Sequence, residues 1–234
     1  MSDSSTSGTE RSRPFVVDLY CGHGGVGLAL DELGVDYLGV DIEDRSDTYP
    51  GEFVRADASV PPLDVDADLV WASPPCTAYS SLSPTHYGSR EAAMEACPTI
   101  PELDIREIAE SLGTEYIIEN VPGASRVGHL RDATRLNGIA FGRPYVLERH
   151  FETSFSVPDA VEAGEPAVKI QTRDGQDQSV RDLAEAKGVP ASWGKQGVRS
   201  AIPSEYVHWL LSFCPSVDAP RPSREQALLT EVRG

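Results

Sequence analysis

Lysine is scarce in this sequence of 234 residues, because Lys169, Lys187 and Lys195 are the only three among 20 basic residues. Acidic residues number 37, so the formal net charge is −17. Excess surface carboxylate keeps a protein soluble in concentrated salt, which favours a halophilic source; a GC-rich genome is the alternative explanation. An acidic chain is not an obvious nucleic-acid binder. Because molar salt screens charges beyond a few Å, a local arginine cluster could still contact phosphates.

Long hydrophobic runs are also absent, and none approaches the roughly 20 residues that a membrane-spanning helix needs. Residues 1–13 are polar and rich in serine and threonine, so we expect a disordered tail rather than a secretory signal. The cysteines Cys21, Cys76, Cys97 and Cys214 form no Cys-x-x-Cys pair, which argues against a metal site and a disulfide framework. These absences predict a protein of the reducing cytoplasm with no membrane partner.

Short apolar runs alternate with helical periodicity and turn signals, which predicts an α/β fold with a mostly parallel sheet. Strands are expected at 14–19, 37–42, 53–56, 69–72 and 115–118, with a strand or hairpin at 145–155. Helices are expected at 26–33, 102–112, 126–137, 179–186 and 202–213. Irregular segments are expected at 157–175, at 188–201 and at 77–90, which is long enough to suggest a functional lid.

Residues 20–25 form a glycine-rich turn between the first expected strand and the first expected helix. Such an arrangement opens nucleotide-binding units, because glycine permits close backbone approach and the helix N-terminus offers free N–H donors. The spacing is not Gly-x-Gly-x-x-Gly, so a dinucleotide site is not favoured. Asp41 lies 23 residues after Asp18, near the spacing at which an acid reaches ribose hydroxyls. The alternative for Asp41 is a turn residue or a helix cap.

Cys76 follows the apolar run 69–72 and two prolines, which end the strand because proline cannot donate to a sheet. Ligands of open α/β sheets bind at the carboxyl ends of the strands, so Cys76 is a candidate nucleophile there. Glu119 ends the strand 115–118 at the same edge, where a carboxylate in a dry pocket can hold a proton. The structural alternatives are a loop cysteine after a Pro-Pro turn and a glutamate that caps a helix or points to solvent.

Taken together, these motifs resemble those of the DNA cytosine C5-methyltransferases, in a compact phage-like or haloarchaeal form. Residues 18–25, Asp-Leu-Tyr-Cys-Gly-His-Gly-Gly, look like the family's S-adenosylmethionine loop. Residues 74–80, Pro-Pro-Cys-Thr-Ala-Tyr-Ser, are similar to its nucleophile motif, and residues 119–121 match its Glu-Asn-Val motif. The order and spacing of the three motifs agree with the family. The resemblance covers about 15–155 and, more weakly, 201–210.

The resemblance implies a Rossmann-like S-adenosylmethionine-dependent methyltransferase fold with a reduced target-recognition segment. Cys76 would attack C6 of a cytosine flipped out of DNA, Glu119 would hydrogen-bond the ring at N3, and Arg149 would orient the base. S-adenosylmethionine would supply the methyl group, and no metal is implied. The implied cofactor-binding residues are Asp18, Leu19, Tyr20, Cys21, Gly22, Gly24, Gly25, Asp41, Ile42, Asp57, Ala58 and Pro74.

The sequence also departs from the family pattern. Thr77 replaces a glutamine, and the Gln-x-Arg-x-Arg segment is reduced to Glu-Arg-His-Phe at residues 148–151, where Arg149 is the best match. The segment before the closing motif is short and lacks an evident base-reading pattern. The expected organisation is a tail at 1–13, a catalytic and cofactor-binding domain at 14–156, a reduced target-recognition insert at 157–194, a return to the catalytic domain at 195–214 and a loose tail at 215–234.

Several alternatives remain open at this stage. DNA is the expected partner of a monomeric enzyme, and the resemblance also allows a restriction endonuclease as a second partner. RNA or a free cytidine nucleotide is the alternative substrate, because the recognition segment is short and the chain acidic. A cofactor-binding module without catalysis is the alternative from another class, because the arginine motif is eroded. A nicotinamide oxidoreductase is less favoured, since the glycine turn has the wrong spacing.

Overall fold

The computed structural model describes residues 13–170 and 179–220 and contains one seven-stranded sheet with the order β3-β2-β1-β4-β5-β7-β6. Only β7 runs antiparallel to its neighbours, so the expected mostly parallel, Rossmann-like sheet is confirmed. The strands are β1 (Phe15–Leu19), β2 (Asp36–Asp41), β3 (Glu52–Arg55), β4 (Ala67–Ala72), β5 (Gly113–Asn120), β6 (Thr134–Leu136) and β7 (Arg149–Thr153).

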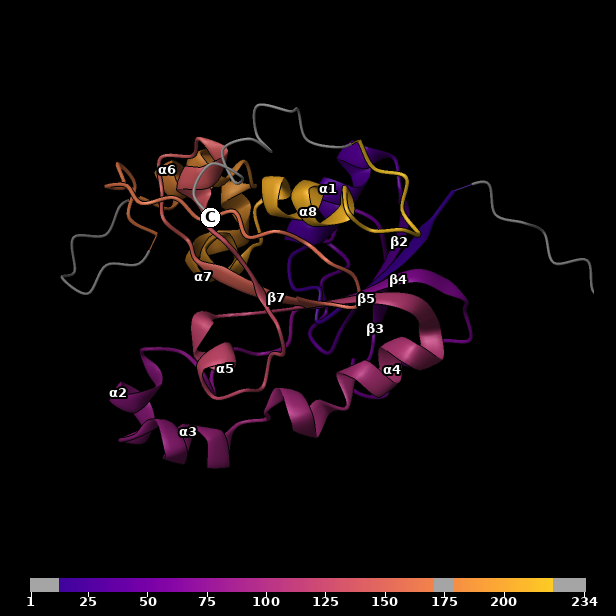
Figure 1. Ribbon diagram of the computed structural model, residues 1–234, viewed down its shortest axis with the longest axis horizontal. Coiled ribbons are helices and arrows are strands. Elements are labelled where there is room, and N and C mark those ends of the chain that lie inside the picture. The colour runs from indigo at the N-terminus through magenta and orange to yellow at the C-terminus, as the bar shows by residue number, and fades with distance from the viewer. Residues whose placement is uncertain (1–12, 171–178, 221–234) are drawn as a thin grey trace, which may run out of the picture.

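Helices cover both faces of the sheet, with α1, α6, α7 and α8 on one face and α2, α3, α4 and α5 on the other (Figure 1). Their bounds are α1 (Gly25–Leu33), α2 (Ser83–Tyr87), α3 (Arg90–Ala96), α4 (Ile105–Leu112), α5 (Pro122–Arg126), α6 (Val180–Lys187), α7 (Gly194–Ser200) and α8 (Ser204–Leu211). Three 3₁₀ turns, η1 (Ile100–Leu103), η2 (Gly138–Phe141) and η3 (Ala191–Trp193), complete the set within the described ranges. None of these helices is long and apolar enough to cross a membrane.

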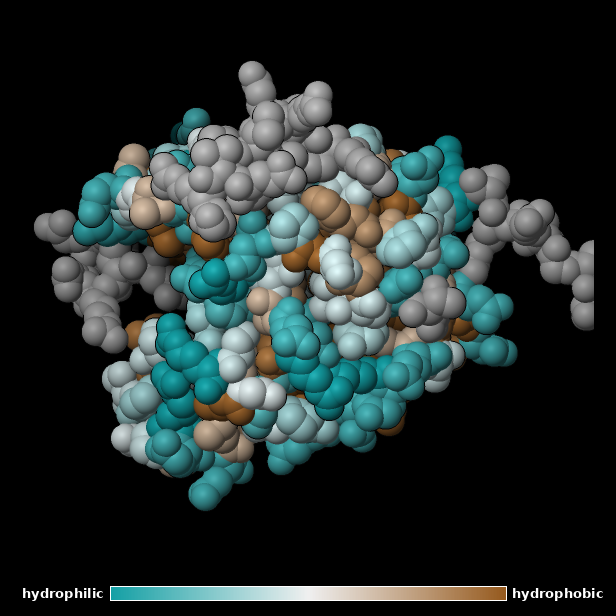
Figure 2. Space-filling model, viewed as in Figure 1, coloured by the Kyte–Doolittle hydropathy of each residue, from teal (hydrophilic) through white to brown (hydrophobic). Residues whose placement is uncertain are grey.

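The central strands are apolar on both sides because each side packs against a helical layer. In β4, Leu69 and Trp71 belong to the core with α1 and α8, whereas Val70 and Ala72 belong to the core with α4. A parallel sheet buried on both faces therefore produces the continuous apolar runs of the sequence rather than strict alternation. On the outer surface, hydrophilic side chains cover most of the face shown in Figure 2, in keeping with the net charge of −17.

The strand register brings the carboxyl ends of β1, β4 and β5 to one edge. Leu19 pairs with Ala72, and Ala72 pairs with Ile118, so the residues that follow each of these three lie next to one another. This edge therefore carries the start of the glycine turn, the Ser-Pro-Pro-Cys turn and Glu119. The expected convergence of the motifs on one edge is confirmed.

The expected helix at 126–137 is wrong, because the segment forms the end of α5, a turn and the edge strand β6. Leu130, Ala133 and Leu136 recur every three residues, which mimics helical periodicity. In the structure Leu130 and Leu136 enter the cores on opposite faces of the sheet, which no single helix face could achieve. The positive φ of Asp132, 41°, turns the chain just before β6.

Other predicted bounds also differ from the structure. The segment 188–201 is not irregular, because it forms η3 and α7, and 77–90 contains α2 and the start of α3. Two glycines in α7 lower its helix propensity, so tertiary contacts must hold this helix. The helix expected at 102–112 begins at Ile105, after η1, and the strand within 145–155 is restricted to β7. The tail 1–12, part of the insert (171–178) and residues 221–234 lie outside the described residues.

A buried ion pair joins helix α4 to strand β7. Arg106 donates to both carboxylate oxygens of Glu152 at 2.6 Å, and the side chain of Glu152 is 3% exposed. The Arg131 backbone N–H and the Tyr116 hydroxyl donate to the same carboxylate. Burial opposes ionisation of Glu152, but these donors hold its pKa below the ordinary value of 4.5. The carboxylate is therefore compensated only while Arg106 is present.

We expect Arg106→Met to lower the free energy of unfolding by about 3 kcal/mol at neutral pH, because it leaves Glu152 buried without its cation. Urea denaturation measures this loss. The exposed Arg135–Asp159 pair provides the control, and Arg135→Met should cost less than about 1 kcal/mol. Since the folded pKa of Glu152 lies below its unfolded value, the contribution is complete above pH 4.5 and disappears as the pH falls through the folded pKa. Equal losses for the two variants would contradict the assignment.

Candidate active site

The glycine turn after β1 has a backbone that few side chains tolerate. Tyr20, Gly22 and Gly24 have φ angles of 57°, 54° and 97°, so the chain enters the left-handed region three times in five residues. The Asp41 carboxylate fixes this turn, because its Oδ2 accepts a hydrogen bond from the Gly22 N–H at 2.9 Å. The turn therefore has one shape, set by β1 on one side and by the end of β2 on the other.

Two glycines of this turn face protein atoms. A Cβ on Gly24 would lie 2.3 Å from Cδ of Pro50, and a Cβ on Gly25 would lie 2.8 Å from the backbone nitrogen of Ile202. Both distances are shorter than any real Cβ contact, so neither position accepts a side chain without movement of the backbone. The close backbone approach expected from the sequence is therefore present, and the residues that approach the turn are Pro50 and Ile202 of the same chain.

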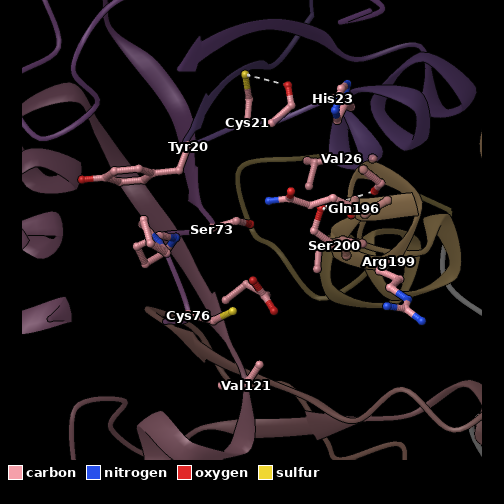
Figure 3. A pocket seen from close by; sticks show the side chains of 18 of the residues that line it. Tyr20, Cys21, His23, Val26, Ser73, Cys76, Val121, Gln196, Arg199 and Ser200 are labelled. Atoms are coloured by element: carbon pink, nitrogen blue, oxygen red, sulfur yellow. Dashed lines mark hydrogen bonds between the residues drawn. The ribbon is translucent and has the colours of Figure 1, made fainter. Parts of the chain in front are cut away.

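A cavity of about 590 Å³ lies at the carboxyl edge of the sheet. Its walls come from the glycine turn, the Ser-Pro-Pro-Cys turn, the end of β5, Arg149 of β7 and residues 195–202 around the end of α7. Figure 3 shows Tyr20, Ser73 and Cys76 on one side of this space and Gln196 and Ser200 on the other. The volume is within the range of small-molecule sites, which are typically about 300–1,000 Å³.

Cys76, Glu119 and Arg149 meet on one wall of this cavity. Arg149 Nε lies 3.0 Å from Glu119 Oε1, and both side chains are about nine-tenths buried. The Arg149 guanidinium also donates to the Glu148 carbonyl oxygen at 3.0 Å, which fixes its orientation. The three residues that the sequence predicts to be catalytic are thus brought together by three different strands.

The charge of Glu119 affects the neighbouring thiol of Cys76. Burial raises the pKa of Glu119 to about 6, although the charges of Arg149 and Lys187 act in the opposite direction. Cys76 is exposed to the cavity, but desolvation by the atoms around its thiol, together with the negative charge of Glu119, raises its pKa. Arg149 partly offsets this effect. A carboxylate that gains a proton just below neutral pH therefore lies beside a thiol whose ionisation depends on it.

The turn that carries Cys76 is held from behind by the Glu-Asn-Val segment. Asn120 Nδ2 donates to the Pro74 carbonyl oxygen at 3.0 Å, and its Oδ1 accepts the Val121 N–H. Gly123 approaches so closely that a Cβ there would lie 2.0 Å from the Tyr79 carbonyl oxygen. The segment 74–80 and the start of α5 are therefore packed tightly against each other.

The residues with implied cofactor roles occupy three kinds of place. Tyr20, Cys21, Gly22, Gly25 and Pro74 line the cavity. A second group is buried in the interior and does not line the cavity; it consists of Asp18, Leu19, Gly24 and Ala58. The third group lies at the ends of β2 and β3 and consists of Asp41, which is half-buried, and of Ile42 and Asp57, which are exposed.

Asp18 has a supporting position rather than a cavity-facing one. It is fully buried, its Oδ2 accepts the Tyr49 hydroxyl at 3.1 Å, and burial raises its pKa to about 8. Asp57, by contrast, accepts the Ser59 N–H and hydroxyl, and these hydrogen bonds lower its pKa. Asp41 and Asp57 are thus the predicted acids with access to solvent, although neither of them lines the cavity.

Sequence reasoning missed one wall of the cavity. Residues 195–201 were expected to be irregular, but they include most of α7 and face the Ser-Pro-Pro-Cys turn across the cavity. His23 connects this wall to the glycine turn, because its ring stacks on Trp193 and a Cβ on Gly197 would lie 2.5 Å from it. The pairing of a tryptophan and a glycine four residues apart is the only sequence signal that could have indicated this contact.

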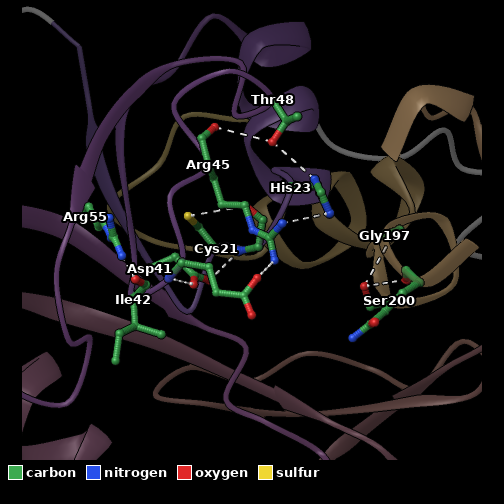
Figure 4. Close-up of polar contacts among 12 residues, drawn as sticks. Cys21, His23, Asp41, Ile42, Arg45, Thr48, Arg55, Gly197 and Ser200 are labelled. Atoms are coloured by element: carbon green, nitrogen blue, oxygen red, sulfur yellow. Dashed lines mark hydrogen bonds and ion pairs between the residues drawn. The ribbon is translucent and has the colours of Figure 1, made fainter. Parts of the chain in front are cut away.

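His23 is also fixed from the other side by the loop after β2 (Figure 4). Arg45 lies 3.2 Å from His23 Nε2, and since a guanidinium can only donate, this nitrogen must accept. The ring proton is then on Nδ1, which donates to the Thr48 hydroxyl at 3.2 Å. The neutral ring agrees with its lowered pKa, which results from burial and from the nearby Arg45 charge.

A second hollow of about 390 Å³ adjoins the first, and Ser80, Val121 and Arg149 line both. Its other walls are the start of α5, residues 146–148 and residues 166–170 of the insert. Three cations, Arg126, Arg149 and Lys169, line this hollow with one carboxylate, Glu148. Two spaces therefore meet next to Cys76, and the second is more basic than the chain as a whole.

We expect Glu119→Gln to speed the alkylation of Cys76 by iodoacetamide several-fold at pH 8. Removing the negative charge lowers the pKa of the thiol, and each unit by which it falls raises the thiolate fraction about tenfold. Peptide mass spectrometry distinguishes Cys76 from the other free cysteines. Glu148→Gln is the matched control and should leave the rate unchanged. A slower or equal rate in Glu119→Gln would show that Glu119 does not control this thiol.

Comparisons with known proteins address the fold. No protein-family model matches the sequence, and a search of curated proteins finds no match. Among solved structures, the chain is similar to a DNMT2 mutant from Spodoptera frugiperda and to the methyltransferase EhMeth from Entamoeba histolytica, each with a TM-score of 0.58. The first protein is 13% identical, and its alignment covers 86% of this chain and 99% of that protein. The second is 9% identical, and its alignment covers 87% of this chain and 98% of that protein. The chain therefore has the fold of these methyltransferases, as its motifs led us to expect.

Proposed function

We propose that the protein is a DNA cytosine C5-methyltransferase that uses S-adenosylmethionine. The observation that carries this proposal is the position of Cys76 beside the buried Glu119–Arg149 pair, on the wall of a cavity that also contains the glycine turn. The Rossmann-like methyltransferase fold supports it, as does the resemblance of the three motifs. A thiol, a proton-holding carboxyl group and a cation are the groups that C5 methylation of cytosine requires.

The residues of the cavity fit the proposed cofactor. The volume of about 590 Å³ suits a small molecule, and Tyr20, Cys21 and Gly22 of the glycine turn form one side of the space. In the proposal, Gly22 and Gly25 lie against the methionine part, Asp41 accepts the ribose hydroxyls, and Asp57 accepts the adenine amine. S-adenosylmethionine would supply an electrophilic methyl group at the Cys76 side of the cavity.

Cys76 and Glu119 would act together on the cytosine ring. C5 of cytosine is a weak nucleophile, and addition of the Cys76 thiolate to C6 makes C5 electron-rich. Protonated Glu119 would donate to N3 and stabilise the ring as the thiolate adds. This contact also neutralises the charge that keeps the pKa of the thiol high, so substrate binding would favour the thiolate. Loss of the C5 proton after methylation would then expel the thiolate.

The second hollow supports a polynucleotide substrate. It joins the cavity at Arg149, and its other two cations, Arg126 and Lys169, would contact phosphates although the whole chain is acidic. A cytosine must leave its stack to reach Cys76, and the hollow offers space for the strand on either side of it. The DNA assignment follows the motif resemblance, and the same chemistry would serve RNA or a free nucleotide. The substrate is therefore the first thing to test.

The decisive assay measures transfer of labelled methyl from S-adenosylmethionine to duplex DNA, RNA and cytidine nucleotides in high salt. We expect 5-methylcytosine in DNA with the wild type and none with Cys76→Ala. Glu119→Gln should slow transfer by roughly 10²-fold or more, as expected for a positioned proton-handling group. Cys97→Ala is the matched control and should retain activity.

Each other outcome has a defined meaning. Label in RNA or nucleotides alone would replace the proposed substrate and keep the chemistry. Cofactor binding without transfer to any substrate would indicate a module that has lost catalysis. Full turnover by Cys76→Ala would remove Cys76 from the mechanism.

The assignment of Asp57 generates a separate expectation. Asp57→Ala should weaken the binding of S-adenosylhomocysteine by roughly tenfold, because the adenine amine would lose a charged acceptor. Asp64→Ala removes another exposed carboxylate from the same connection between β3 and β4 and should leave the affinity unchanged. Isothermal titration calorimetry measures both constants. Equal affinities for the two variants would place the adenine elsewhere.

A further inference from the structure

Lys187 is the last residue of α6 and is almost completely buried, with 1% of its surface exposed. Its Nζ donates to three backbone carbonyl oxygens, those of Val198 at 2.8 Å, Arg199 at 3.2 Å and Ala201. Carbonyl oxygens can only accept, so three such bonds require the three protons of an ammonium group. A buried, charged lysine with every proton bound is costly to place unless it has a specific partner.

The partner is the C-terminal end of α7. The last carbonyl groups of a helix lack partners within the helix and form the negative end of its dipole, which favours a cation. Lys187 supplies that cation from another element, and it holds the chain as it leaves α7 at Ala201. Gln196, Ser200 and Ile202 of this segment line the cavity opposite Cys76. The lysine therefore fixes the wall of the candidate site from behind.

Lys187 is also close enough to the reactive wall to affect its charges. Burial and the charge of Arg149 of β7 lower the pKa of Lys187 well below its ordinary value, whereas Glu119 of β5 and Glu205 of α8 act in the opposite direction. The three carbonyl acceptors also favour the ammonium form, because they leave no donor for a neutral amine to accept from. In the other direction, the charges of Arg149 and Lys187 hold the pKa of Glu119 lower than burial alone would set it. Arg149 reaches Glu119 directly, whereas Lys187 acts on it without a direct bond.

We propose that Lys187 is a positioning residue that holds the end of α7, shapes the cofactor-facing wall of the cavity and places its buried charge near Glu119. This inference rests on the proposed methyltransferase function for the identity of the cofactor. It assigns the insert helix α6 a role in support of the active site, in addition to any contact of the insert with a nucleic acid. The buried side chains of α6, η3 and α7 agree with this, because Leu183, Trp193 and Val198 share one core.

Three variants of the full chain test the proposal. Lys187→Met removes the charge and all three donors, Lys187→Gln removes the charge but keeps two donors, and Arg181→Met removes an exposed charge from the same helix as a control. Calorimetry measures the affinity for S-adenosylhomocysteine. Carboxyl carbon NMR of protein labelled at glutamate, assigned with Glu119→Gln, measures the pKa of Glu119 without any need for turnover.

We expect Lys187→Met to weaken cofactor binding by roughly tenfold, as loss of buried hydrogen bonds would do. We expect both Lys187 variants to raise the pKa of Glu119 from its value of about 6, and Arg181→Met to change neither quantity. A folded Lys187→Met with wild-type affinity and an unchanged Glu119 titration would overturn the proposal. If Lys187→Met does not fold, Lys187→Gln decides, and an unchanged Glu119 pKa in that variant overturns the proposal equally.

Failure of the wild type to bind S-adenosylhomocysteine would have a different meaning. That result would overturn the proposed function and the cofactor part of the role of Lys187. The Glu119 titration would still decide the electrostatic part, because it depends on the fold alone.

Discussion

The buried pair of Glu119 and Arg149 is the interaction on which the site depends. A carboxylate with so little access to water costs free energy unless a cation lies beside it, and Arg149 at 3.0 Å provides that cation. The pair also sets the state of the neighbouring thiol, since the Glu119 charge raises the pKa of Cys76 and the Arg149 charge opposes it. The ion pair and the shifted pKa of the thiol therefore exist only when the three strands that carry these side chains are correctly paired.

Much of this arrangement follows from the sequence, because it depends on strand ends. Parallel strands present their carboxyl ends at one edge, so an apolar run that stops at Pro-Pro-Cys and another that stops at Glu119 must meet there. The local pattern was enough to place Cys76, Glu119 and the glycine turn together. Arg149 was also predicted correctly to lie beside Glu119, although its motif is reduced, because β7 pairs directly with β5.

The errors arose where local pattern and tertiary contact disagree. Leu130 and Leu136 have helix-like spacing but pack on opposite faces of the sheet, so periodicity alone misassigned their segment. Helix α7 contains two glycines and gives a weak local signal, and its end is fixed by Lys187 from a different helix. Long-range contacts of this kind produce no periodic pattern in the amino-acid sequence.

The crowded glycines of the turn after β1 affect which residues of the glycine motif are retained during evolution. Gly24 is closed in by Pro50 and Gly25 by Ile202, so a side chain at either position would disturb folding whether or not a ligand binds. Selection for a stable fold alone would keep these glycines in a descendant that had lost catalysis. Cys76 is different, because it is exposed and belongs to no core cluster among the described residues. Under the proposed mechanism, retention of the thiol among homologues would therefore distinguish working enzymes from inactive ones, and retention of the glycines would not.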